Sequence, residues 1–101
     1  MKFNWEDHKV EIEAACESHK AFMREHGEFL GNPDTSAWAF VFWWSGERLE
    51  RYDVGELEEA QAVVDYYHFS KARTRVVMRD TCEDVTDRIK FNPSYHDTFK
   101  K

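Results

Sequence analysis

The sequence predicts an α+β fold in which two helices pack on one face of a four-stranded antiparallel sheet, in the order α-β-β-α-β-β. Three observations lead to it: helical spacing of apolar residues in two segments, alternation in four short segments, and turn residues between them. The 101 residues fit one domain, 1–101, with 92–101 expected to be a loose C-terminal tail. The same order would arise from a split βαβ domain whose first strand has moved to the end.

Residues 5–26 are predicted to form the first helix. Asn4 or Asp7 can cap its start, and Gly27 follows its end. Its sheet-facing stripe is only moderately apolar, and it consists of His8, Ile12, Ala15, His19, Phe22 and His26, with Cys16 and Met23 beside it.

Residues 37–44 give the strongest strand signal, because they are dense in aromatic side chains and bounded by turn residues. Ser45 and Gly46 suit a two-residue hairpin loop, after which residues 48–53 form the returning strand. This loop would pair Phe42 with Leu49 and Trp43 with Arg48.

Residues from Gly55 to about Ser70 are predicted to form the second helix, with acidic residues in its first turn. The third strand is expected over residues 74–79, and the fourth over residues 85–91, where Asn92 and Pro93 end it.

Alternation separates the predicted sheet into a core face and an open face. We assign the apolar set of each strand to the core, which collects Trp38, Phe40, Phe42, Trp44, Leu49, Val76, Met78, Val85, Ile89 and Phe91. The open face then combines aromatic and basic side chains, with Val41 and Val77 among them. Its candidate partner-binding residues are Trp43, Arg48, Tyr52, Arg73, Arg75, Arg79, Arg88 and Lys90. The alternative interpretation is that these basic residues serve solubility and edge protection.

Motifs for catalysis, cofactors and metals are absent from the sequence, so we expect no enzyme and no cofactor. There is no phosphate-binding loop, dinucleotide-binding motif or zinc-protease motif. His8, His19 and His26 share a stripe, but even the closest two are roughly 10 Å apart along a helix axis. The acidic residues at positions 80–87 lack the spacing of a calcium loop.

The net charge of −6 disfavours nonspecific attraction to nucleic acid or to an anionic membrane. No apolar run approaches the length that spans a membrane, and we expect a cytoplasmic protein, in the host cell if it is phage-encoded. Cys16 and Cys82 are expected to be free thiols, with a single disulfide as the alternative.

These observations favour a non-enzymatic protein-binding module that uses the basic, aromatic face or the acidic first helix. Bacteriophages and mobile elements encode small acidic proteins of this kind as inhibitors of a host enzyme or defence system, of the anti-CRISPR or anti-restriction type. A second hypothesis is single-stranded nucleic-acid binding on the open sheet face. A homodimer through that face is a third, although like charges would meet in it.

Overall fold

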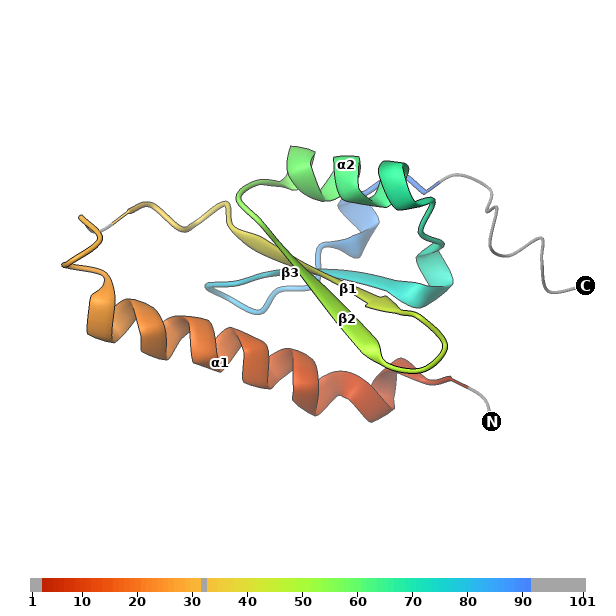
Figure 1. The fold of residues 1–101 in the computed structure, drawn as a ribbon, viewed down its shortest axis with the longest axis horizontal. Coiled ribbons are helices and arrows are strands. Elements are labelled where there is room, and N and C mark those ends of the chain that lie inside the picture. Colours follow the sequence, from red (N-terminus) through yellow and green to blue (C-terminus); the bar gives the residue numbers. More distant parts are fainter. Residues whose placement is uncertain (1–2, 32, 92–101) are drawn as a thin grey trace, which may run out of the picture.

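The computed structural model describes residues 3–31 and 33–91, and it has an α+β architecture (Figure 1). The predicted tail at 92–101 lies outside these described residues. The elements follow one another as the 3-10 turn η1 (Trp5–His8), α1 (Lys9–His26), β1 (Ala39–Trp44), β2 (Leu49–Val54), α2 (Leu57–Tyr67), the 3-10 turn η2 (Lys71–Arg73), β3 (Thr74–Met78) and the 3-10 turn η3 (Thr86–Arg88).

The described residues form one antiparallel sheet of three strands in the order β2-β1-β3. β1 and β2 pair with Trp44 opposite Leu49 and Phe42 opposite Arg51. The hairpin loop therefore spans four residues and not two, closed by a hydrogen bond from the Ser45 amide to the Arg48 carbonyl (3.1 Å). The predicted register is wrong by two residues. Because side chains alternate with a period of two, the faces of these two strands are still as predicted.

The two helices cover opposite faces of the sheet, which corrects the prediction that both lie on one face (Figure 1). The cause is β1 itself, whose first five residues are all buried. A strand that is apolar on both faces requires a cover on both faces. The predicted arrangement, with both helices on one face, contains only one core.

The core beneath α2 contains the face of β1 that had been assigned to solvent. Val41 and Trp43 pack there against Val64 of α2 and Phe69. Val76 of β3 joins them, together with Val85 and Ile89 from the segment after β3. At about 25 cal/mol per Å² of apolar surface, this packing is the main stabilising contribution on this side of the sheet.

The core beneath α1 is smaller and is built on Phe40, Phe42 and Val77 of the sheet. The structure describes every residue of α1, and only Cys16 among them is buried. The C-terminal turns of α1 extend beyond the end of the sheet, which leaves Phe22 exposed (Figure 1). The predicted stripe therefore meets the sheet along only part of its length.

The segment 85–91 does not form the predicted fourth strand. The residue before it, Asp84, forms an isolated bridge with Val77. Within the segment, the Val85 amide donates to the Val76 carbonyl (2.8 Å), and the Thr86 hydroxyl accepts from the Val76 amide (2.9 Å). The Asp84 carboxylate accepts hydrogen bonds from the amide and the hydroxyl of Thr86, which turns the chain into η3. A local side-chain acceptor thus competes successfully with strand pairing.

Candidate functional site

The eight residues predicted to share an open face do not lie together. Trp43 and Tyr52 belong to the α2 side of the sheet, whereas Arg75 lies opposite Phe42 on the α1 side. The reason is that Val76 pairs with Val41, so β3 is turned by one residue relative to the predicted arrangement. Adjacent Val76 and Val77 are both buried, each under a different helix.

Four of the other predicted basic residues lie in loops and 3-10 turns, outside the strands. Arg48 lies in the hairpin loop beside Glu50 (3.7 Å), and Arg73 stands over the Trp43 ring at 6.0 Å. Arg88 faces Glu83 at 3.6 Å. Lys90 is exposed, and its backbone is held by the Gln61 side chain. Only Trp43, Tyr52, Arg48 and Arg73 therefore gather in one region.

Two further arginines combine with aromatic rings on the α1 side of the sheet. Arg75 lies over Trp5 at 4.8 Å, and Arg79 lies over Trp38 at 5.1 Å. Arg79 also donates hydrogen bonds to the Ala39 and Val54 carbonyls (3.1 and 3.0 Å). Burial lowers the pKa of Arg79, and the nearby Asp53 carboxylate opposes this effect. Both arginine side chains are partly buried, and each is held by an aromatic ring and by backbone carbonyls.

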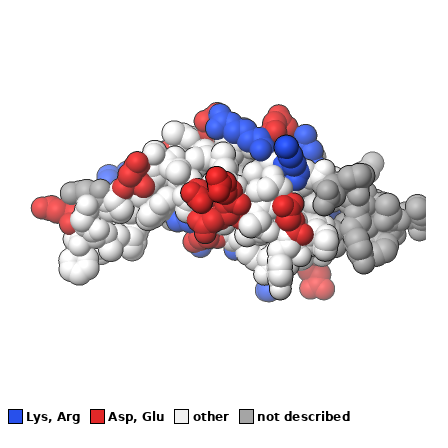
Figure 2. Space-filling model, turned by 90° about the horizontal axis from the view of Figure 1, so that it is seen from above, with Lys and Arg blue, Asp and Glu red and all other residues white. Residues whose placement is uncertain are grey.

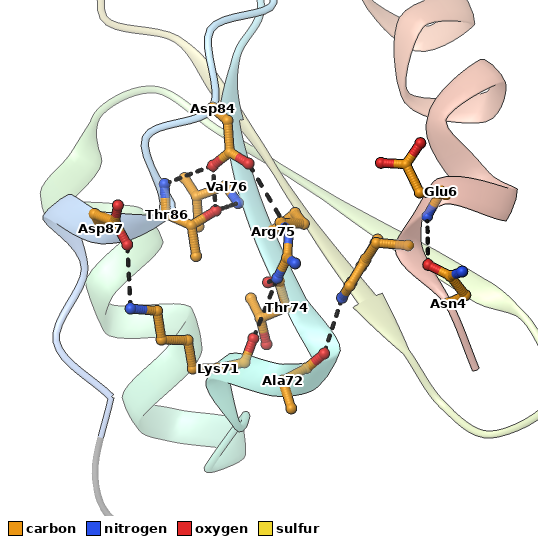
Figure 3. Close-up of polar contacts among 11 residues, drawn as sticks. Asn4, Glu6, Lys71, Ala72, Thr74, Arg75, Val76, Asp84, Thr86 and Asp87 are labelled. Atoms are coloured by element: carbon orange, nitrogen blue, oxygen red, sulfur yellow. Dashed lines mark hydrogen bonds and ion pairs between the residues drawn. The ribbon is translucent and has the colours of Figure 1, made fainter. Parts of the chain in front are cut away.

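The start of β3 shows how firmly one of these arginines is held (Figure 3). The Arg75 guanidinium donates to the Thr74 and Lys71 carbonyls (2.8 and 3.4 Å) and faces Asp84 at 3.8 Å. The Trp5 indole donates to the Ala72 carbonyl at 2.8 Å. These contacts line one side of a cavity of about 230 Å³, which is bounded by Trp5, Glu6, Lys9, Ile12, Glu13, Arg75, Val77, Cys82 and Asp84.

An exposed aromatic cluster lies at the C-terminal end of α2, and we call it the tyrosine patch. It consists of Tyr52, Tyr66 and Tyr67. The ring centres of Tyr66 and Tyr67 are 4.9 Å apart, and those of Tyr52 and Tyr67 are 5.4 Å apart. Tyr66 is 77 % exposed and Tyr67 is 46 % exposed. The sequence interpretation included Tyr52 but missed the other two.

The tyrosine patch rests on a buried aromatic base. Phe69 stacks on Trp43 with ring centres 4.1 Å apart, and Tyr67 stacks on Phe69 at 5.3 Å. Trp43 is only 8 % exposed. Trp43, Phe69 and Tyr67 therefore form a continuous column from the core to the surface, and Tyr66 meets its outer ring edge-on.

The end of α2 explains why these rings meet. His68 takes a left-handed backbone conformation (φ 57°), and its amide donates to the Val64 carbonyl. The Phe69 amide donates to the same carbonyl at 3.1 Å. This arrangement ends the helix and turns Phe69 back toward the sheet. Four ring-bearing residues in a row at a helix end, at positions 66–69, were the available sequence signal.

Polar groups surround the tyrosine patch. The Tyr52 hydroxyl donates to the Glu50 carboxylate at 3.3 Å. Burial, followed by the Glu50 charge, raises the pKa of Tyr52. Figure 2 looks onto the α2 side and shows acidic side chains across this face, with lysines and arginines along one of its edges.

In the part of the chain that the structure describes, titratable residues do not converge in a way that would hold a metal ion. Within residues 3–31 and 33–91, no group of three or more His, Cys, Asp and Glu side chains has the required arrangement. In the same part of the chain, no helix has both the length and the apolar character needed to cross a membrane.

Comparisons of the chain with protein-family models, with curated proteins and with solved structures gave no match.

Proposed function

We propose that this protein is a non-catalytic protein-binding domain whose contact surface is the tyrosine patch. The observation that carries the proposal is the exposure of Tyr66 and Tyr67 on a buried column of rings. Tyrosine and tryptophan are enriched in binding hot spots because they bury a large area with few rotatable bonds. Exposed tyrosines that are already held in place lose little conformational entropy when a partner covers them.

The surroundings of the tyrosine patch suit a protein partner. Glu50, Arg48 and Arg73 supply both signs of charge at its margin. A mixed polar rim around an aromatic centre is typical of protein interfaces. A nucleic acid would favour a rim that is basic throughout.

The partner class that we propose is a host enzyme or defence system, inhibited in the manner of anti-CRISPR or anti-restriction proteins. Small size, a net charge of −6 and the absence of catalytic motifs support this class. The corresponding assay adds the purified protein to a host nuclease of the CRISPR or restriction type and measures DNA cleavage. We expect inhibition that depends on dose and is lost in Tyr66→Ala.

The nucleic-acid hypothesis requires an open sheet face on which bases can stack. α1 and α2 cover the two faces of the sheet. Sheet-surface binders stack bases on exposed aromatic rings of the strands, and Trp43 and Phe42 are buried. A labelled oligonucleotide at low salt is the matching control, and we expect no change in its fluorescence anisotropy.

The experiment that tests the proposal compares Tyr66→Ala/Tyr67→Ala with Phe29→Ala in capture from host lysate. Phe29 is the matched control, because it is 90 % exposed and lies in the turn after α1. We expect wild type and Phe29→Ala to retain the same protein, and the double variant to lose it. All three proteins should have similar circular dichroism spectra. Equal capture by the double variant would refute the proposal.

A further inference from the structure

Two cysteines that lie far apart in the sequence meet at the interface between α1 and the turn that follows β3. The Cys16 thiol points at the Met78 carbonyl oxygen (3.9 Å), and the Cys82 amide donates to that same oxygen (2.9 Å). Cys82 also packs against the apolar cluster that contains Cys16. One carbonyl oxygen thus brings the two residues together.

The surroundings of the two thiols differ in accessibility. Cys16 is buried in α1, and burial together with the hydrogen-bonded Cys82 thiol raises the pKa of Cys16 to about 12. Cys82 is partly exposed and lines the cavity of about 230 Å³ between the start of α1 and β3. A small oxidant can therefore reach Cys82 first, with Cys16 behind it as the second thiol.

The turn holds Cys82 in an unusual conformation. Its φ is 60°, in the left-handed region that residues other than glycine, asparagine and aspartate rarely occupy. The turn is closed by hydrogen bonds from the Cys82 amide to Met78 and from the Met78 amide to Glu83, both 2.9 Å. The backbone is thus fixed in the conformation that packs Cys82 against the cluster of Cys16.

We infer that Cys16 and Cys82 form a reversible dithiol–disulfide pair that, when oxidised by a small disulfide such as glutathione disulfide, fastens α1 to the turn after β3. The Cys82 thiolate attacks one sulfur of the oxidant, forms a mixed disulfide and releases one thiolate. The Cys16 thiolate then attacks the Cys82 sulfur and releases the second. The two cysteines lose two electrons and two protons, and the oxidant is reduced to two thiols.

The disulfide would act on α1, which has less apolar packing than α2. α1 contributes one buried side chain to its core, so a covalent link at that side chain would limit its separation from the sheet. The link also closes a loop of about 65 residues, which restricts the unfolded chain. We expect the midpoint of thermal unfolding to rise by on the order of 10 °C.

The test uses the full chain, reduced or incubated with excess glutathione disulfide, then denatured and treated with N-ethylmaleimide. Intact mass should show two N-ethylmaleimide groups on the reduced protein. The oxidised protein should carry no N-ethylmaleimide group and should be two hydrogens lighter than the unlabelled reduced protein. After treatment with dithiothreitol, it should again react with two N-ethylmaleimide groups. Two free thiols after oxidation, a persistent glutathione adduct, or a disulfide-linked dimer would overturn the inference.

Cys82→Ser is the matched control, because it keeps the buried Cys16 in place. We expect glutathione disulfide to leave its thermal midpoint unchanged, while the wild-type midpoint rises. Amide exchange in α1 should also slow on oxidation of the wild type alone. An equal rise in Cys82→Ser would show that the link does not cause the effect.

Discussion

The two helices lie on opposite faces of one sheet, but different contacts hold them there. α2 has 11 residues and packs Ala60 and Val64 into a core with Phe69, Val85 and Ile89. α1 has 18 residues and buries Cys16 alone among them. Ile12 and Ala15 of α1 pack against the same core but stay partly exposed, and His19 pairs with the Asp80 carboxylate at 2.9 Å. Helix length therefore says little about how strongly a helix is attached.

The difference also separates the proposed roles of the two sides. The α2 side has the larger apolar core, and the tyrosine patch projects from it. A rigid base suits a contact surface, because little entropy is lost on binding. The α1 side carries the cavity and the cysteine pair, where a covalent link would have the greatest effect.

The largest expected effect is a loss in the free energy of unfolding, and it is measured by comparing alanine substitutions at the two isoleucines of the chain. Ile89 is 6 % exposed in the α2-side core, whereas Ile12 is partly exposed on α1. We expect Ile89→Ala to lower the free energy of unfolding by about 3 kcal/mol, and Ile12→Ala by about 1 kcal/mol, because the cavity term scales with burial. Urea denaturation of both variants measures the difference. Equal losses would contradict the comparison.

A smaller effect is expected where polar groups attach α1. The Asp80 carboxylate accepts hydrogen bonds from Thr35 (2.8 and 2.9 Å) and pairs with His19 of α1 (2.9 Å). We expect Asp80→Ala to lower the free energy of unfolding by about 1.5 kcal/mol, since it leaves partly buried groups without partners.

The control for Asp80→Ala is Glu17→Gln, also in a contact of α1. Glu17 pairs with Lys20 at 3.4 Å on the exposed side of the helix. We expect a change of less than about 0.5 kcal/mol. If the Glu17 variant loses as much stability as Asp80→Ala, the attachment is not specific to Asp80.

An effect smaller than that of Asp80→Ala is expected at Arg79, where the charge can be kept while the shape changes. Arg79→Lys loses the two separate nitrogens that donate to the Ala39 and Val54 carbonyls, and it loses the planar group over Trp38. We expect a loss of about 1 kcal/mol in urea denaturation. A change near zero would mean that charge alone matters here.

The sequence predicted the class of fold, both helices, the hairpin and the third strand, because those segments have clear periodicity and turn residues between them. It did not predict the second core. Alternation separates the two faces of each strand but does not say which face of β3 matches which face of β1. The adjacent buried pair Val76 and Val77 decides this only in the structure.

The candidate site was predicted in part for the same reason. Trp43, Tyr52, Arg48 and Arg73 do gather near the tyrosine patch, because β1 and β2 kept their faces. Tyr66 and Tyr67 were missed, since helical spacing does not reveal the left-handed residue His68, which turns Phe69 beneath them. The prediction of a fourth strand was wrong because the hydrogen bonds of Asp84 and Thr86 outweigh the strand propensity of this segment.

Native-state hydrogen exchange of individual amides tests the central claim most directly, which is that α1 is held less firmly than α2 and the sheet. We expect amides in the middle of α1 to exchange at least ~10-fold faster than those of α2 and β1, because fewer apolar contacts must break for α1 to open. Protection of α1 equal to that of β1 would contradict the account.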